Sequence, residues 1–299
     1  MRRISYLFFS AFMALAGACG KKPDAAARLD TFPIKTASAR VLDLEETIVL
    51  VGSVKAKDEA ILFSRVPGKL KENLLKEGDS VRKGQAVSLV ERDEVGVRFE
   101  PAPVPSTLSG TVARIYLDRG ENVTPQTAVA LVVDQSEVIA RAEVPERYAA
   151  RSAAGQGVRV KVEAYPDRVF TGRVSRVSPV VDPATRSTLI EARLDNPSGK
   201  LRSGMFGELT LITGSRSGVV AVPKDALTDG SGPAVFVVEN GKALRREVEL
   251  GLQGDRFLEI RKGVKPGEKV VVFGLYGLKD GSPVEVLADL SDKEESSAP

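Results

Sequence analysis

The sequence predicts a mainly β protein built from several small domains. Valine is frequent, and 27 glycines and 17 prolines interrupt the chain at short intervals, which favours short strands over long helices. The stretch 68–90 is followed, 42 positions later, by a similar stretch at 110–132. A repeat of this kind indicates a domain made of two equivalent halves. The length of 299 residues allows about two domains of ~150 residues each.

Composition argues against several classes of function. The chain has no histidine and one cysteine, so the commonest general base and the commonest metal ligand are missing. It also lacks a G-x-S-x-G nucleophile turn, a Walker loop and a G-x-G-x-x-G motif between a strand and a helix. Two of its three methionines, Met1 and Met13, lie at the N-terminus, so no methionine cluster could bind copper or silver. We therefore expect a non-enzyme that binds no metal and no cofactor.

The charge is close to balance. The 43 basic and 40 acidic residues give a formal net charge of +3, and without Arg2 and Arg3 the remaining 41 basic residues face 40 acidic ones, a net of +1. Nothing in this balance predicts a nucleic-acid partner.

Residues 1–19 resemble an export signal, with a basic start, an apolar core and a small-residue cleavage region. Cys19 stands where a bacterial lipoprotein signal places the lipidated cysteine, although Ala16 replaces the more usual leucine. We favour lipid attachment at Cys19; the alternative is an ordinary signal peptide with an incidental cysteine. Residues 20–33 are polar and alanine-rich, and we expect a flexible tether.

The repeat predicts two strands around a tight turn in each half. The turns hold Gly78-Asp79 and Gly120-Glu121, where glycine can take a positive φ and the acidic side chain can bond the nearby backbone. Alternating apolar residues would be buried if the two halves faced each other as a sandwich. The four glycines that recur in register are Gly68, Gly78, Gly110 and Gly120.

This repeat resembles the split lipoyl, or biotinyl-like, domain, which we place at 55–134, with halves 55–92 and 104–134 and a short connector 93–103. Such domains occur in carriers that display a modified lysine between the halves, and in periplasmic adaptors (HlyD-like membrane fusion proteins) of tripartite efflux pumps. The residues between the halves, ERDEVGVRFEPAPVPS, include no lysine. The resemblance is therefore to the adaptors.

The connector differs from most adaptors, which insert a long α-helical hairpin here. It is short and has prolines at 101, 103 and 105, which are incompatible with a helix in its second half. We therefore predict a variant without the helical hairpin. The loop that would face the outer-membrane channel contains Arg92, Asp93, Glu94, Arg98 and Phe99; the alternative is a plain solvated loop.

The spacing of apolar, strand-like segments in 135–214, with part of 44–54, predicts a small antiparallel β-barrel. Pro145 could start a short helix over 145–154. The later stretch resembles the adaptor barrel signature, a proline, D-x-x-T-R, N-P and L-R-x-G-M, carried here by Pro179, Asp182, Thr185, Arg186, Asn196, Pro197, Gly204 and Met205. We expect Asp182 and Thr185 to cap a turn, and Arg186 either to pair with Asp182 or to make a surface contact. Gly204 would turn the chain before Met205 and Phe206 enter the core.

Residues 215–290, joined by 34–43, resemble the membrane-proximal domain of the family, so both ends of the chain would build one domain. The segment 291–299 is small, polar and acidic, and we expect it to be disordered.

The resemblance implies a linear multi-domain adaptor in the periplasm, anchored to the inner membrane by the lipid. It would link an inner-membrane proton-driven transporter of the resistance-nodulation-division (RND) class to an outer-membrane channel, and would self-associate into a ring, with a hexamer expected. Two alternatives remain: an adaptor of an ATP-driven (ABC) macrolide-type exporter, and a stand-alone envelope-binding lipoprotein.

Overall fold

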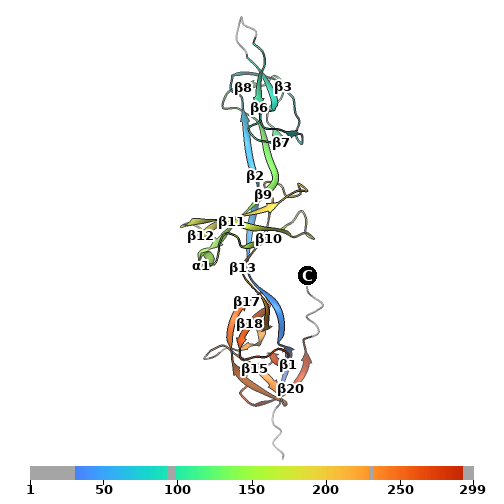
Figure 1. The fold of residues 1–299 in the computed structure, drawn as a ribbon, viewed down its shortest axis with the longest axis vertical. Coiled ribbons are helices and arrows are strands. Elements are labelled where there is room, and N and C mark those ends of the chain that lie inside the picture. Colours follow the sequence, from blue (N-terminus) through green and yellow to red (C-terminus); the bar gives the residue numbers. More distant parts are fainter. Residues whose placement is uncertain (1–30, 93–98, 229, 231, 292–299) are drawn as a thin grey trace, which may run out of the picture.

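The computed structural model describes residues 31–92, 99–228, 230 and 232–291, which form an elongated, mainly β molecule (Figure 1). Three β bodies follow one another along the long axis. We call them the sandwich, the barrel and the terminal body. Each has its own buried apolar core, with the terminal body's core divided into two neighbouring clusters. The mainly β class predicted from the sequence is confirmed.

The terminal body is built from both ends of the described chain. Its six-stranded sheet has the order β14-β15-β16-β20-β1-β19, in which β1 is parallel to β20 and antiparallel to β19. The early strand therefore lies inside a sheet formed otherwise by C-terminal segments. The strands are β1 (Phe32–Ser38), β14 (Leu227–Thr228), β15 (Ala234–Glu239), β16 (Lys242–Glu247), β19 (Lys269–Phe273) and β20 (Ser282–Asp289).

The barrel closes on itself. Antiparallel pairing runs in the order β13-β10-β11-β12-β9-β2 and returns to β13, so each strand has a neighbour on both sides. Alternate residues of these strands fill the interior, as period-two patterning requires. The strands are β2 (Arg40–Phe63), β9 (Ala128–Pro145), β10 (Gly157–Val162), β11 (Phe170–Asp182), β12 (Ser187–Asp195) and β13 (Phe206–Pro223).

The sandwich consists of two four-stranded layers, β2-β9-β7-β4 and β6-β5-β3-β8. A shift of 42 positions places β5 on the start of β9, β3 on β7 and β4 on β8, so the two layers are equivalent. The additional strands are β3 (Gly68–Asn73), β4 (Ser80–Val81), β5 (Ala86–Glu91), β6 (Ala102–Pro105), β7 (Gly110–Ile115) and β8 (Asn122–Val123).

Three long strands join the bodies. β2 has 24 residues and pairs with β9 in the sandwich and with β13 in the barrel and beyond it; β9 and β13 have 18 residues each. β13 continues out of the barrel to pair with β18 (Phe257–Lys262), which in turn pairs with β17 (Glu249–Gln253). Because these strands change partners without ending, hydrogen-bonded ribbons rather than free linkers connect neighbouring bodies.

Helical structure is limited to two short segments in the described ranges. The predicted helix at 145–154 is only α1 (Glu146–Ala149), which begins after Pro145, and η1 (Lys224–Ala226) is a single 3-10 turn. No helix in the described residues is long and apolar enough to span a bilayer.

Candidate functional site

The two repeat turns have matching geometry. Gly78 and Gly120 have φ values of +94° and +93°, a region that L side chains rarely adopt. The carboxylate of Asp79 accepts a 2.7 Å hydrogen bond from the amide of Lys76, and that of Glu121 accepts a 2.9 Å bond from the amide of Asp118. Each acidic side chain therefore closes its own turn.

The other two repeat glycines serve a different purpose. A Cβ at Gly68 would lie 2.1 Å from the carbonyl oxygen of Glu91, and one at Gly110 would lie 2.2 Å from that of Val133. Glu91 and Val133 are also 42 positions apart. Both glycines thus allow the same close backbone approach, one in each layer.

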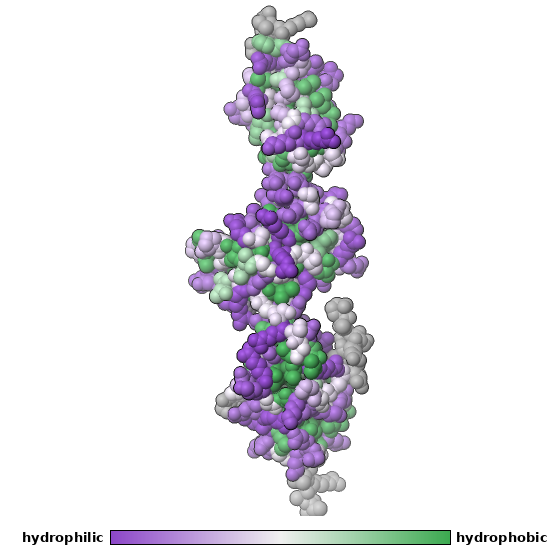
Figure 2. Space-filling model, in the orientation of Figure 1, coloured by the Kyte–Doolittle hydropathy of each residue, from purple (hydrophilic) through white to green (hydrophobic). Residues whose placement is uncertain are grey.

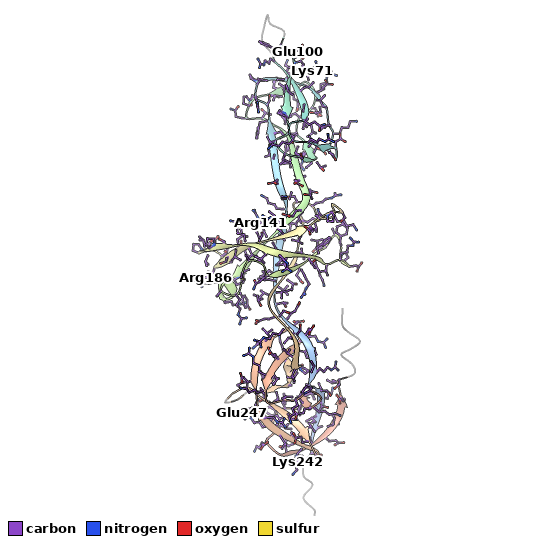
Figure 3. The ribbon with its side chains drawn as sticks, in the orientation of Figure 1. Lys71, Glu100, Arg141, Arg186, Lys242 and Glu247 are labelled. Carbon is purple, nitrogen blue, oxygen red and sulfur yellow. The ribbon has the colours of Figure 1, made fainter. Side chains whose placement is uncertain are left out.

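Glu100, in the described part of the connector, lies at the end of the molecule farthest from the terminal body (Figure 3). β5 ends at Glu91 and β6 begins at Ala102, so ten residues (92–101) join two paired strands. The guanidinium of Arg92 lies over the ring of Phe99, 4.8 Å from its centroid. The other predicted loop residues, Asp93, Glu94 and Arg98, lie outside the described residues, as does Cys19.

The D-x-x-T-R part of the barrel signature forms the turn between β11 and β12. The carbonyl of Asp182 accepts a 2.8 Å bond from the amide of Arg186, and its side chain accepts a 2.8 Å bond from the amide of Ala184. The hydroxyls of Thr185 and Ser187 are 2.7 Å apart. Pro179 lies where the β11–β12 register shifts, a position where its missing N–H is tolerated.

Arg186 has an exposed side chain and an unusual backbone. Its φ is +51°, a left-handed conformation that is uncommon for residues other than glycine and asparagine. Across the described ranges its guanidinium forms no ion pair with Asp182 or any other carboxylate. Figure 3 shows Arg186 at the side of the barrel, away from the long axis. Of the two roles expected for Arg186, this placement favours a surface contact.

The N-P part of the signature is held by a buried amide. Asn196 is only 3% exposed. Its Nδ2 donates to the carbonyls of Gln135 and Leu201, each at 2.8 Å, and its Oδ1 accepts a 3.0 Å bond from the amide of Leu201. Pro197 follows it in the turn. Asn196 therefore ties the β12–β13 loop to the start of the barrel.

The G-M part of the signature joins β13 to β2. Gly204 has a φ of +91°, and its amide donates a 2.9 Å bond to the carbonyl of Val54. Met205 packs against the barrel core, as expected. The expectation for Phe206 was wrong, because its side chain is 69% exposed. Successive strand residues point to opposite faces, so if Met205 faces inward Phe206 must face out.

Sequence reasoning did not find the groove beside Phe206. This groove of about 530 Å³ is bordered by exposed apolar side chains, with Val49 and Val51 of β2 at 61% and 80% exposure. The missed signal was the continuous apolar run 48–51: in an antiparallel strand with one buried face, such a run leaves an apolar outer face.

A buried carboxylate on the barrel, Glu191, forms an ion-pair cluster with two arginines. Glu191 is 8% exposed and contacts Arg176 at 2.9 Å and Arg141 at 2.7 Å. The hydrogen bond from Arg176, with the positive charge of Arg141, holds the pKa of Glu191 below its usual range against the opposing effect of burial. The cluster braces β9, β11 and β12, and Figure 3 shows Arg141 on the barrel.

A second buried carboxylate lies at the junction of the barrel and terminal body. Glu259 of β18 accepts a 2.6 Å bond from the amide of Leu252 and a 3.0 Å bond from Arg216 of β13. Burial alone would raise the pKa of Glu259, but these two donors hold it below its usual range. A Cβ at Gly251 would lie 2.1 Å from the Glu259 carboxylate, so any larger residue there would displace that carboxylate from its donors.

In the described part of the chain, no group of three or more cysteine or acidic side chains is placed to hold a metal ion. The features found instead are turns, ion pairs and exposed contact surfaces. They lie on an elongated β protein made of three bodies.

Comparison with known proteins gives two matching domain families. Residues 137–215 match the CusB-like β-barrel domain, and residues 219–286 match the C-terminal permuted SH3-like domain of YknX. Among relatives, the nodulation protein NolF of Rhizobium meliloti is 32% identical over 185 residues, covering 61% of this chain and 50% of NolF. The cation efflux system protein CusB of Escherichia coli K12 is 28% identical over 190 residues, covering 63% and 46%.

The aligned segments thus span about half the length of these two relatives. The crystal structure of MacA from Actinobacillus actinomycetemcomitans shares the fold, with a TM-score of 0.64 at 18% identity, covering 79% of this chain and 98% of that one. The chain therefore contains a β-barrel domain like that of CusB and a C-terminal permuted SH3-like domain like that of YknX, and it shares its fold with MacA.

Proposed function

We propose that this protein is the periplasmic adaptor of a tripartite pump, linking an inner-membrane RND transporter to an outer-membrane channel. The observation that carries the proposal is the order of the three bodies along one elongated chain, with a CusB-like barrel in the middle. Such a chain can contact one partner at each end. Its role is mechanical: the adaptor does not chemically alter the exported substrate.

The long strands support this role. β2 and β9 join the sandwich to the barrel, and β2 and β13 join the barrel to the terminal body. A hydrogen-bonded ribbon resists bending more than a single strand does, so a movement at one end is transmitted to the other. The Arg216–Glu259 pair adds a side-chain contact at the lower junction.

We further propose that the terminal body faces the inner membrane and that Cys19 carries the anchoring lipid. β1 begins at Phe32, so about a dozen residues separate Cys19 from the terminal body. A chain of that length spans at most ~45 Å. The lipid would therefore hold the terminal body close to the bilayer, and the 92–101 loop would point to the channel.

A second candidate is an adaptor for an ATP-driven exporter of macrolide type. It is favoured by the 27% identity to the macrolide export protein MacA of Escherichia coli O157:H7, over 188 residues, and by the shared fold with MacA. The third, a stand-alone envelope-binding lipoprotein, has the same anchor and no transporter partner.

The deciding experiment is affinity purification of the tagged chain from gently solubilised membranes, with mass spectrometry of the proteins that accompany it. An RND transporter supports the first proposal, and an ATP-binding permease supports the second. A well-folded chain that brings no transporter would overturn both.

A further inference from the structure

We propose that the turn between β11 and β12 of one copy inserts into the groove beside Phe206 of a second copy. This inference deepens the self-association into a ring that the sequence resemblance implies, and it rests on the proposed adaptor function. We call residues 179–186 the barrel knob, and the groove bordered by Val49, Val51 and Phe206 the barrel groove.

The barrel knob is an exposed projection with apolar side chains. Val180 is 66% exposed, Val181 is 38% exposed, and the neighbouring prolines 179 and 183 are also exposed. Figure 2 shows apolar residues at the side of the barrel, where Figure 1 places the ends of β11 and β12. Several exposed apolar side chains on one projecting turn indicate a contact surface.

Arg186 strengthens this interpretation. Glycine and asparagine adopt a left-handed backbone conformation in a hairpin loop most easily. An arginine in that conformation costs on the order of 1 kcal/mol of folding free energy. The chain nevertheless places an exposed guanidinium at this position. The backbone of Arg186 closes the turn by donating to the carbonyl of Asp182, but its guanidinium has no carboxylate partner among the described residues. That side chain is therefore available for a contact with another molecule, a role in which arginine is common.

The barrel groove offers matching chemistry. Phe206 pairs with Ser53 and Glu208 pairs with Val51, so the exposed phenyl ring and valines lie on adjoining positions of two neighbouring strands. The rim carries Lys161, Glu163 and Glu208. The apolar side chains of the groove can pack against the knob's valines. The carboxylates of Glu163 and Glu208 can pair with Arg186, and Lys161 can pair with Asp182.

Knob and groove cannot meet within one chain. β11 begins at Phe170, close to the 163–169 turn that borders the groove, and ends at Asp182 in the knob. These ends are separated by up to ~40 Å of strand. A contact between different patches on two copies is heterologous, and such contacts close into rings when the rotation between copies permits.

The test uses full-length chains in a Cys19→Ser background, so that each variant carries a single thiol. Val180→Cys and Val51→Cys are purified separately and mixed with a short bifunctional maleimide. We expect cross-linked dimers from the mixture and not from either variant alone. Dimers from one variant alone, in the amount that the mixture gives, would indicate a contact between identical patches and overturn the inference.

Arg186→Gly supplies an independent arm, because it relieves the left-handed strain while removing the guanidinium. We expect unchanged or higher thermal stability, with the Kd of self-association raised about tenfold in sedimentation measurements. Asn240→Gly is the matched control, since Asn240 is left-handed in the β15–β16 turn (φ +50°) and we expect no effect on association.

If Arg186→Gly associates like the unmodified chain, or if the unmodified chain stays monomeric at all concentrations, the inference is wrong. Transporter capture is scored separately. If the transporter is captured but Arg186→Gly does not weaken self-association, the adaptor role stands and only this interface is rejected. If the mixture of cysteine variants cross-links but no transporter is captured, the interface stands and the pump proposal is rejected.

Discussion

The backbone amide of Gly120 donates a 2.8 Å hydrogen bond to the carbonyl oxygen of Leu70. Forty-two positions earlier, the amide of Gly78 donates the equivalent 2.8 Å bond to Val112. The return bonds also match: Leu70 donates to Glu121 at 2.8 Å, and Val112 donates to Asp79 at 2.9 Å. Each half of the repeat therefore completes the turn of the other half, so the two must fold together.

The first prediction concerns these turns. Gly78→Val and Gly120→Val should each lower the free energy of unfolding by about 1–3 kcal/mol, because valine at a φ near +93° is strained, and the double variant should lose several kcal/mol. Denaturant unfolding measures the change. Gly157→Ala is the control, since its added Cβ would meet only the end of the Ile212 side chain at 3.2 Å. Unchanged melting of both valine variants would contradict the role of the turns.

The second prediction concerns Asn196. Asn196→Ala removes three hydrogen bonds and leaves the Gln135 and Leu201 carbonyls without their side-chain donor. We expect a loss of about 2–4 kcal/mol of stability, measured by chemical denaturation. Hydrogen exchange should show the 196–204 loop opening first. A loss no larger than that of an exposed Asn→Ala substitution would show that the loop is held by other contacts.

The third prediction concerns pH. The folded state holds the pKa of Glu191 below its unfolded value, so its contribution to stability is present above about pH 4.3 and is lost as the pH falls through the folded pKa. Glu191→Gln should destabilise the protein by about 2 kcal/mol at pH 7. The difference in Tm between Glu191→Gln and the unmodified chain should then shrink on acidification.

Exposed Glu285 provides the control for this pH series. Glu285→Gln should match the unmodified chain at every pH. A Tm difference for Glu191→Gln that stays constant from neutral to acid pH would show that the ionised carboxylate is not what stabilises the cluster.

The fourth prediction concerns the lower junction. Gly251→Ala should displace the Glu259 carboxylate from Arg216 and the Leu252 amide, at a cost of about 2–3 kcal/mol. Limited proteolysis should then cut faster between the barrel and the terminal body. Equal proteolysis of Gly251→Ala and the Gly157→Ala control would argue that this contact does not hold the junction.

The fifth prediction concerns the proposed anchor. Cys19→Ser should move the protein from the membrane fraction to the soluble fraction, because no lipid could then be attached. Fractionation followed by intact mass measurement tests both steps. Firm membrane attachment of the serine variant would reject the lipoprotein proposal, although it would not affect the fold.

Arg186 illustrates how far the sequence could predict the candidate contact surfaces. The D-x-x-T-R motif predicted a turn, and the structure shows the carboxylate of Asp182 bonded to the amide of Ala184. The motif left open whether Arg186 pairs with Asp182, because the direction of a side chain depends on the local φ. The positive φ of Arg186 and its exposure emerge only from the folded turn.

Patterns in the sequence alone were enough to predict the mainly β class, the two-half repeat and a connector too short for a helical hairpin. These follow from short-range features: alternation, turn glycines and the short, proline-containing connector 93–103. The folded chain was needed to show that β2 runs through all three bodies, that Phe206 faces outward and that Glu191 contacts two arginines. The physical reason is that alternation separates two faces of a strand but does not say which distant strand pairs with it or covers either face.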